Sequence, residues 1–123
     1  MLVEAPIELI DEARSGLTGR RAEDLATRLS LTDKELARLL SLSIRTFHRI
    51  GLEGKLDAVA SERLLLLEQL ARHGESVFED VGVFARWLRR PLRVLSGHAP
   101  LDLMDTSTGL TLIRSSSDRS SVT

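Results

Sequence analysis

Arg45 and Arg49 are the two side chains of this sequence whose type and spacing best suit a chemical task. They lie four residues apart, so both project from the same face if the segment is helical. Guanidinium groups placed in this way can bind the O6 and N7 edge of guanine or hold phosphate oxygens. Other polar residues that would share this face or follow it are Ser43, Thr46, His48 and Lys55. Together these residues form a candidate surface for double-stranded DNA.

The residues around these positions match the pattern of a helix-turn-helix. Such a motif needs a small residue where its helices cross, a tight turn, and apolar residues that clamp the second helix on the first. Ala37 supplies the small residue and Ser41 the turn, while the apolar positions are filled by Leu42, Phe47 and Ile50. The pattern predicts a helix-turn-helix at about residues 32–50. The competing interpretation is a helical hairpin whose Arg and His face is only solvated.

No arrangement of reactive side chains in the sequence favours catalysis or a metal site. His48, His73 and His98 stand far apart without a ligand spacing, and the absence of cysteine excludes a thiolate zinc site. Ser96, His98 and Asp102 are the residue types of a catalytic triad, but residues this close together in one turn cannot adopt triad geometry. No Gly-rich phosphate loop is present. We therefore expect a protein that is not an enzyme and uses no metal or cofactor.

Helical periodicity extends along the chain, and no strand of useful length is predicted. Thr32 and Glu35 are spaced as a capping box, in which each side chain bonds the backbone of the other residue, and Ser43 can cap the next helix. The predicted helical segments are residues 7–14, a helix after the turn at Thr18 and Gly19, one opened by Thr32, one opened by Ser43, and residues 57–74, 81–89, 101–104 and 106–114. The expected fold is all-α, a helix-turn-helix unit packed with a small helical C-terminal domain.

Two apolar clusters indicate where the core lies. Four consecutive leucines, residues 64–67, cover more than one face of their helix, so this helix should be central to the fold. Phe84, Trp87 and Leu88 share one face of the following helix, which favours a core position for Trp87 over a surface anchor. We expect a helical N-terminal unit over residues 1–56, a second helical unit over 57–114, and a flexible Ser-rich tail over 115–123.

The charge of the chain is nearly balanced, with a formal net charge of −1, so any contact with DNA must use a local patch. Residues 20–60 hold eight basic and six acidic side chains and are the most basic part of the chain. No apolar run approaches the roughly 18–20 residues that span a bilayer, and the first twelve residues are acidic, unlike a secretory signal. We expect a soluble, cytoplasmic protein without membrane contact.

Three further motifs follow the predicted helix-turn-helix. They are Ser61-Glu62-Arg63, Trp87-Leu88-Arg89-Arg90-Pro91, and the stretch from Pro100 to Thr106. Together with the segment from Ser43 to Arg49, their order resembles the Xre/MbcA/ParS family of antitoxins over roughly residues 16–113. The resemblance implies a type II antitoxin that binds a RES-domain toxin, an enzyme that depletes NAD⁺ or transfers ADP-ribose from it. It also implies that the complex represses its own operon by binding operator DNA.

The family pattern assigns toxin binding to the C-terminal part of the chain. Its motif includes Pro100, Leu101, Asp102 and Gly109 here, and Arg114 is a further candidate contact. Family members usually continue after this glycine through an apolar helix, whereas this chain soon reaches its run of serines. We therefore expect residues 100–114 to neutralise the toxin and residues 115–123 to be dispensable.

The residues also admit a second interpretation, a stand-alone helix-turn-helix transcriptional regulator that uses its C-terminal domain only to dimerise. In both interpretations the DNA-binding form is expected to be a homodimer or a larger complex. An operator with two half-sites requires two recognition helices, and a chain with little net charge needs both of them for tight binding.

Overall fold

The computed structural model describes residues 6–120, where the regular structure consists of helices and one isolated bridge between Thr18 and Lys55. The elements are α1 (Pro6–Ser15), α2 (Gly19–Leu29), α3 (Asp33–Leu39), α4 (Ile44–Ile50), α5 (Ala58–Phe78), α6 (Val81–Trp87), the 3₁₀ turns η1 (Arg93–Leu95) and η2 (Pro100–Leu103), and α7 (Ser107–Ser120). The prediction of an all-α fold is confirmed. None of the helices in this range has the length and apolar character that a membrane span requires.

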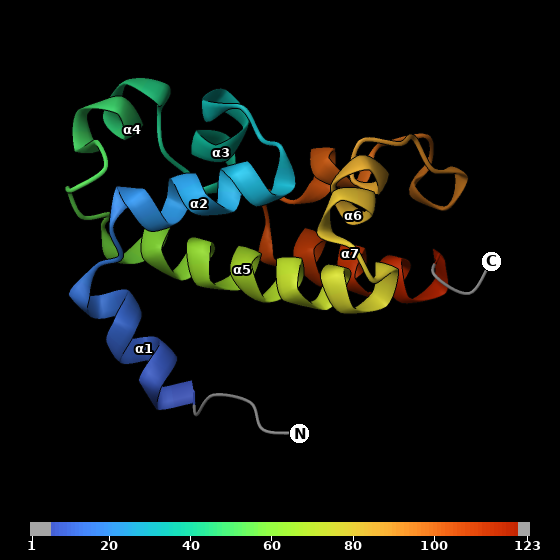
Figure 1. Ribbon diagram of the computed structural model, residues 1–123, viewed down its shortest axis with the longest axis horizontal. Coiled ribbons are helices and arrows are strands. Elements are labelled where there is room, and N and C mark those ends of the chain that lie inside the picture. Colours follow the sequence, from blue (N-terminus) through green and yellow to red (C-terminus); the bar gives the residue numbers. More distant parts are fainter. Residues whose placement is uncertain (1–5, 121–123) are drawn as a thin grey trace.

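The longest helix, α5, forms the long axis of the molecule (Figure 1). α2 lies along one side of α5, α1 packs near its first turns, and α6 and α7 pack against its second half. Leu64, Leu65 and Leu67 are buried, and Leu66 is half-buried. Because leucines on several faces of α5 are buried and α1, α2, α6 and α7 pack on it, the prediction that this helix is central to the fold is confirmed.

α5 does not end near Gly74, as the sequence suggested, but continues to Phe78. Gly74 is buried within the helix, and a Cβ atom at this position would lie 2.4 Å from the ring of Phe84. The glycine therefore allows close packing of α6 on α5 rather than ending the helix. Trp87 stacks on Phe84 with ring centroids 5.9 Å apart and is only 5% exposed, which places it in the core.

Local hydrogen bonds set the starts of the short helices α3 and α4. Thr32 Oγ1 accepts a hydrogen bond from Glu35 N at 3.1 Å, and Glu35 Oε1 accepts one from Thr32 N at 2.9 Å. This confirms the predicted capping box. Ser43 Oγ accepts a hydrogen bond from Thr46 N at 3.0 Å and so caps α4. Between the two helices, Ser41 adopts a left-handed backbone with φ of 62°, which gives the tight turn that the motif needs.

The C-terminal helix is longer than the sequence predicted. Thr106 Oγ1 accepts a hydrogen bond from Gly109 N at 2.9 Å and caps the start of α7, as expected. The helix then runs past Arg114 to Ser120. The expectation of a flexible tail over residues 115–123 is therefore wrong for 115–120, and its last three residues lie outside the described range.

Packing explains why the serines of α7 stay helical. Ser116 and Ser117 are buried, and α7 packs along α5. Small side chains let the two backbones approach closely, and Ser117 Oγ donates a hydrogen bond to Arg114 O at 2.7 Å, whereas the buried Ser116 Oγ has no hydrogen-bond partner among the described residues. Tertiary contact thus outweighs the weak helical preference of serine.

Candidate functional sites

The apolar residues of the helix-turn-helix hold α4 against the body of the molecule. Ala37 and Phe47 are buried, while Leu42 and Ile50 are half-buried and pack against the same core. α3 and α4 are in contact along this interior side. The opposite side of α4 is therefore left to solvent.

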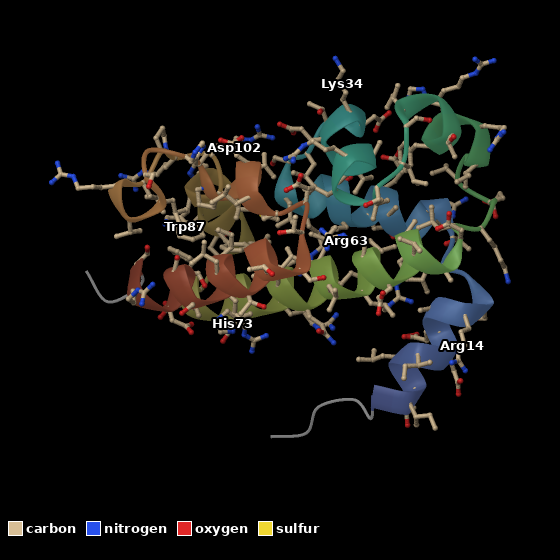
Figure 2. The ribbon with its side chains drawn as sticks, turned by 180° about the vertical axis from the view of Figure 1, so that it is seen from behind. Arg14, Lys34, Arg63, His73, Trp87 and Asp102 are labelled. Carbon is tan, nitrogen blue, oxygen red and sulfur yellow. The ribbon has the colours of Figure 1, made fainter. Side chains whose placement is uncertain are left out.

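The outward face of α4 carries two arginines that no other described residue engages. Arg45 and Arg49 are exposed, and neither makes a side-chain hydrogen bond or ion pair within residues 6–120. Lys34, near the start of α3, is exposed and equally free, and it points away from the molecule on the side where α4 lies (Figure 2). The sequence reasoning missed Lys34, although its place in the first turn of a capped helix was a signal of exposure. Three cations on one side suit a phosphate-bearing ligand.

Three further residues predicted to bind DNA have structural partners within the chain. Ser43 and Thr46 belong to the cap of α4, and their hydroxyl oxygens lie 3.0 Å apart. Lys55 Nζ donates a hydrogen bond to Ser15 O at 3.5 Å, so its ammonium is directed toward the end of α1. Ser43 and Lys55 are exposed and Thr46 is half-buried, and contact with DNA stays a prediction for all three.

His48 faces an acidic pair at the edge of this surface. Its Nε2 lies 3.2 Å from Asp33 Oδ2, which is within hydrogen-bonding distance. Burial and the neighbouring Asp33 carboxylate raise the pKa of Glu23, and the charge of His48 opposes that rise. Acidic side chains repel phosphate, so the attractive part of the surface is formed by the three free cations of α3 and α4.

Arg63 joins the two helical units from inside the core (Figure 2). Its side chain donates hydrogen bonds from Nε to Leu39 O at 3.0 Å and from Nη2 to Met104 O at 2.5 Å, and the residue is only 8% exposed. Leu39 is the last residue of α3 and Met104 follows η2, so one guanidinium caps the C-terminal ends of both elements. Burial lowers the pKa of Arg63, and the charges of Asp105 and Glu62 act in the opposite direction.

Ser61, the first residue of the same motif, also has a structural role. Its Oγ accepts a hydrogen bond from Leu17 N at 2.9 Å and donates one to Leu56 O at 3.4 Å, and the side chain is fully buried. These bonds hold the link between α1 and α2 against the start of α5. The first and last residues of this motif, Ser61 and Arg63, therefore bind segments of both helical units from inside the core.

Arg89 makes a second connection between the units, at the surface. It lies in the turn after α6 and binds the Glu35 carboxylate with two nitrogen atoms, at 2.7 and 2.9 Å. Its Nη2 also donates a hydrogen bond to Ser30 O at 2.7 Å. The Arg89 guanidinium lowers the pKa of Glu35 to about 2, because it stabilises the ionised carboxylate.

Arg38 makes a third connection, from α3 to η2. Its Nη2 donates a hydrogen bond to Leu101 O at 2.9 Å, and its Nη1 lies 3.5 Å from Asp105 Oδ2. With Arg63 and Arg89, it ties the helix-turn-helix to the segment in which the family pattern places toxin binding. We call these three residues the junction arginines.

Three of the five predicted toxin-binding residues lie inside the molecule. Pro100 and Leu101 are buried, and Gly109 is buried where an added Cβ atom would lie 1.6 Å from Leu103 O. These residues fit η2 closely against α7, and direct contact of their side chains with a toxin stays a prediction. The family motif marks this tight junction because no side chain fits at position 109.

Asp102 and Arg114 are the predicted toxin contacts that reach the surface. Asp102 is exposed at η2, and its Oδ2 accepts a hydrogen bond from Ala99 N at 3.2 Å. Arg114 is exposed on α7 and lines a depression between α7 and α5 that Leu66 and Gln69 share. An apolar depression with a cation at its rim suits a protein partner.

The three histidines are not brought together. His48 lies beside Asp33 on the helix-turn-helix, His73 Nε2 lies 2.6 Å from Asp118 Oδ1 between α5 and α7, and His98 is exposed in the loop before η2. Within residues 6–120, no group of three or more His, Asp or Glu side chains is placed to hold a metal ion.

Two family models match this chain. Residues 8–68 match the antitoxin Xre-like helix-turn-helix domain, and residues 73–115 match the C-terminal toxin-binding domain of the antitoxins Xre, MbcA and ParS. A relative from Sphingobium sp. (strain YBL2), named Prs ADP-ribosylating antitoxin, is 26% identical over 119 residues, which cover 89% of this chain and 75% of the relative. The two matched regions meet within α5, and the junction arginines hold them together.

Proposed function

Because this chain belongs to the Xre/MbcA/ParS family of antitoxins, we propose that it neutralises a RES-domain toxin by direct binding and represses its own operon. An antitoxin with a helix-turn-helix and a toxin-binding domain has DNA and a toxin as its partners. The proposal adds the class of toxin and the residues that hold each partner.

The observation that carries the DNA part is the pair of free guanidiniums on the exposed face of α4. Arg45 and Arg49 bind guanine edges or phosphates in the major groove, and Lys34 adds a phosphate contact beside them. The remaining proposed contacts are Ser43, Thr46, His48 and Lys55. A homodimer, or a larger complex with the toxin, presents two α4 helices to half-sites about 34 Å apart.

The toxin is proposed to consume NAD⁺, either by hydrolysis or by transferring ADP-ribose to a target. The name of the Sphingobium relative refers to ADP-ribosylation of Prs, which supports the transfer reaction, because NAD⁺ is the donor in such transfers. The antitoxin acts by occlusion, pressing its C-terminal unit on the toxin's active site. Asp102 and Arg114 supply the exposed polar contacts of that unit.

The test uses the RES-domain toxin that we expect to be encoded next to this chain's gene, with the NAD⁺ concentration as the readout. The toxin alone, supplied with its protein target, should lower NAD⁺, and added antitoxin should stop the loss at a fixed molar ratio. Arg45→Ala/Arg49→Ala should inhibit the toxin as well as the wild type does, since these residues lie on the DNA side. A toxin that binds the antitoxin but leaves NAD⁺ unchanged under all these conditions would overturn the assignment of its chemistry.

A further inference from the structure

Among the helices of residues 6–120, none packs over the face of α5 that lies between α1 and α7 (Figure 2). Leu66 and Gln69 line a depression between α5 and α1 as well as the depression between α5 and α7. The two depressions therefore adjoin at these residues, and we call them together the α5 groove. Its α1 wall is formed by Leu9, Ile10 and Ala13.

Exposed apolar side chains gather at the α1 end of the α5 groove. Ile10 is 47% exposed and Val59 is 61% exposed, and both line the adjoining depression at the start of α5. Apolar side chains grouped around a concave surface indicate an interaction site, whereas single exposed ones are ordinary. From Val59 to Leu70 the floor is about 16 Å long at 1.5 Å per residue, which matches an occupying helix of about three turns.

Charged side chains stand at both ends of the α5 groove. Arg114 lines the end beside α7, and Glu62 lines the end beside α1, where Arg14 lines the adjoining depression. All three side chains are exposed, and none forms a hydrogen bond or an ion pair with another residue in the described range. The occupant that fits best is an apolar helix with an acidic residue near Arg114.

The position of the α5 groove favours the toxin over the other partners. Its α7 wall lies in the matched toxin-binding region, so the groove continues the surface proposed to bind the toxin. Lys34 projects on one side of the molecule, while His73 of α5 and Arg14 of α1 lie toward the other (Figure 2). A second copy seated in the groove would turn its α4 away from the first α4, which would not suit one operator.

On the basis of the proposed function, we infer that the α5 groove receives an apolar helix of the toxin and that α1 takes part in toxin binding. The matched toxin-binding region, residues 73–115, does not include α1 or the first half of α5. The antitoxin then holds its toxin with both helical units while α4 stays free for DNA.

The experiment places a carboxylate in the groove at positions that are already exposed. Ile10→Glu and Val59→Glu remove no buried side chain, so both full-length variants should fold. Leu52→Glu is the matched control, because Leu52 is 45% exposed but lies just after α4. Calorimetry with a catalytically inactive form of the toxin should give at least about 10-fold weaker binding for each groove variant, as for a hot-spot residue. Leu52→Glu should leave toxin affinity unchanged, and the groove variants should keep operator affinity.

Hydrogen exchange supplies an independent readout, since toxin binding should protect residues 7–13 and 59–69. Unchanged toxin affinity in both groove variants, or no protection of these residues, overturns the inference and leaves the proposed function standing. Failure of the wild type to bind the toxin would instead overturn the proposed function. A lower particle mass for Ile10→Glu in light scattering, with toxin affinity intact, would assign the groove to a second copy and also overturn the inference.

Discussion

Two regions of this molecule rely on arginine, and they use it in different ways. On α4, Arg45 and Arg49 are exposed and make no hydrogen bond or ion pair with other described residues. At the junction of the two units, Arg63 is buried with two backbone carbonyls as acceptors, and Arg89 is bound to Glu35. The arginines of α4 keep their charge available to a partner molecule, whereas the junction arginines donate hydrogen bonds to acceptors within the chain.

The contrast shows that burial and pairing, rather than residue type, separate recognition from structure. Replacing an exposed, unpaired arginine changes the folded state little, because water solvates it in both states. Replacing a buried arginine leaves its acceptors without donors and costs stability. Variants in the two regions should therefore change different quantities, operator affinity on α4 and the free energy of unfolding at the junction.

The largest effect is expected for Arg63→Met. Methionine fills a similar volume but donates no hydrogen bond, so Leu39 O and Met104 O lose their partner. Each buried polar group left unsatisfied costs about 1–3 kcal/mol, and the free energy of unfolding should fall by about 2–6 kcal/mol. Urea denaturation measures this change, and Arg45→Met, the matched exposed control, should change it by less than about 0.5 kcal/mol. Equal losses in the two variants would remove the contrast between the regions.

Arg45→Ala/Arg49→Ala should give the next largest effect, on operator affinity. A base-edge arginine contributes roughly 1–3 kcal/mol of discrimination, and a phosphate contact steepens the dependence of binding on salt. Fluorescence anisotropy at several salt concentrations separates these roles, because loss of a phosphate contact flattens the salt dependence. The melting temperature should stay at the wild-type value, and operator binding that also stays unchanged would show that α4 does not read DNA.

The ion pair between Glu35 and Arg89 should make stability depend on acid pH. The pKa of Glu35 is lowered from 4.5 to about 2 in the folded state, so the folded protein favours the ionised carboxylate. This contribution is complete above pH 4.5 and is lost as the pH falls toward 2. Because Arg89 is partly exposed, solvent screening reduces it to roughly 1 kcal/mol. Glu35→Gln should show a smaller loss of stability between pH 5 and 3 than the wild type, whereas parallel pH profiles would contradict the pairing.

The exposed helix-turn-helix could be predicted from the sequence, because the residues that determine its helix starts and its turn are close together in the chain. The capping box of Thr32 and Glu35, the cap at Ser43 and the turn at Ser41 each depend on residues within a few positions of one another. The face of α4 follows from helical spacing alone, once that segment is known to be a helix. Its two arginines could therefore be assigned to one surface before any tertiary contact was known.

The junction could not be predicted in the same way, because its contacts join distant parts of the chain. Arg63 binds carbonyls 24 and 41 residues away, and no spacing in the sequence indicates either partner. The motif resemblance singled out Arg63 without its role, and it suggested surface contacts for Pro100 and Gly109, which are buried. The serines at the end of α7 were misjudged for the same reason, since packing on α5 rather than local preference keeps them helical.

Arg28→Ala should have the smallest effect on the free energy of unfolding. It separates the contribution of pairing from that of burial, because Arg28 is paired but not buried. Its Nη2 lies 3.1 Å from Glu75 Oε1, and the two side chains are 37% and 52% exposed. An exposed ion pair of this kind contributes about 0.2–1 kcal/mol, since water and salt screen the attraction. A double-mutant cycle with Glu75→Ala isolates the pair from the other contacts of each residue. If the coupling energy of Arg28 and Glu75 is near zero, the stability of the junction comes from burial of its arginine. If it is as large as the loss in Arg63→Met, pairing alone accounts for that stability.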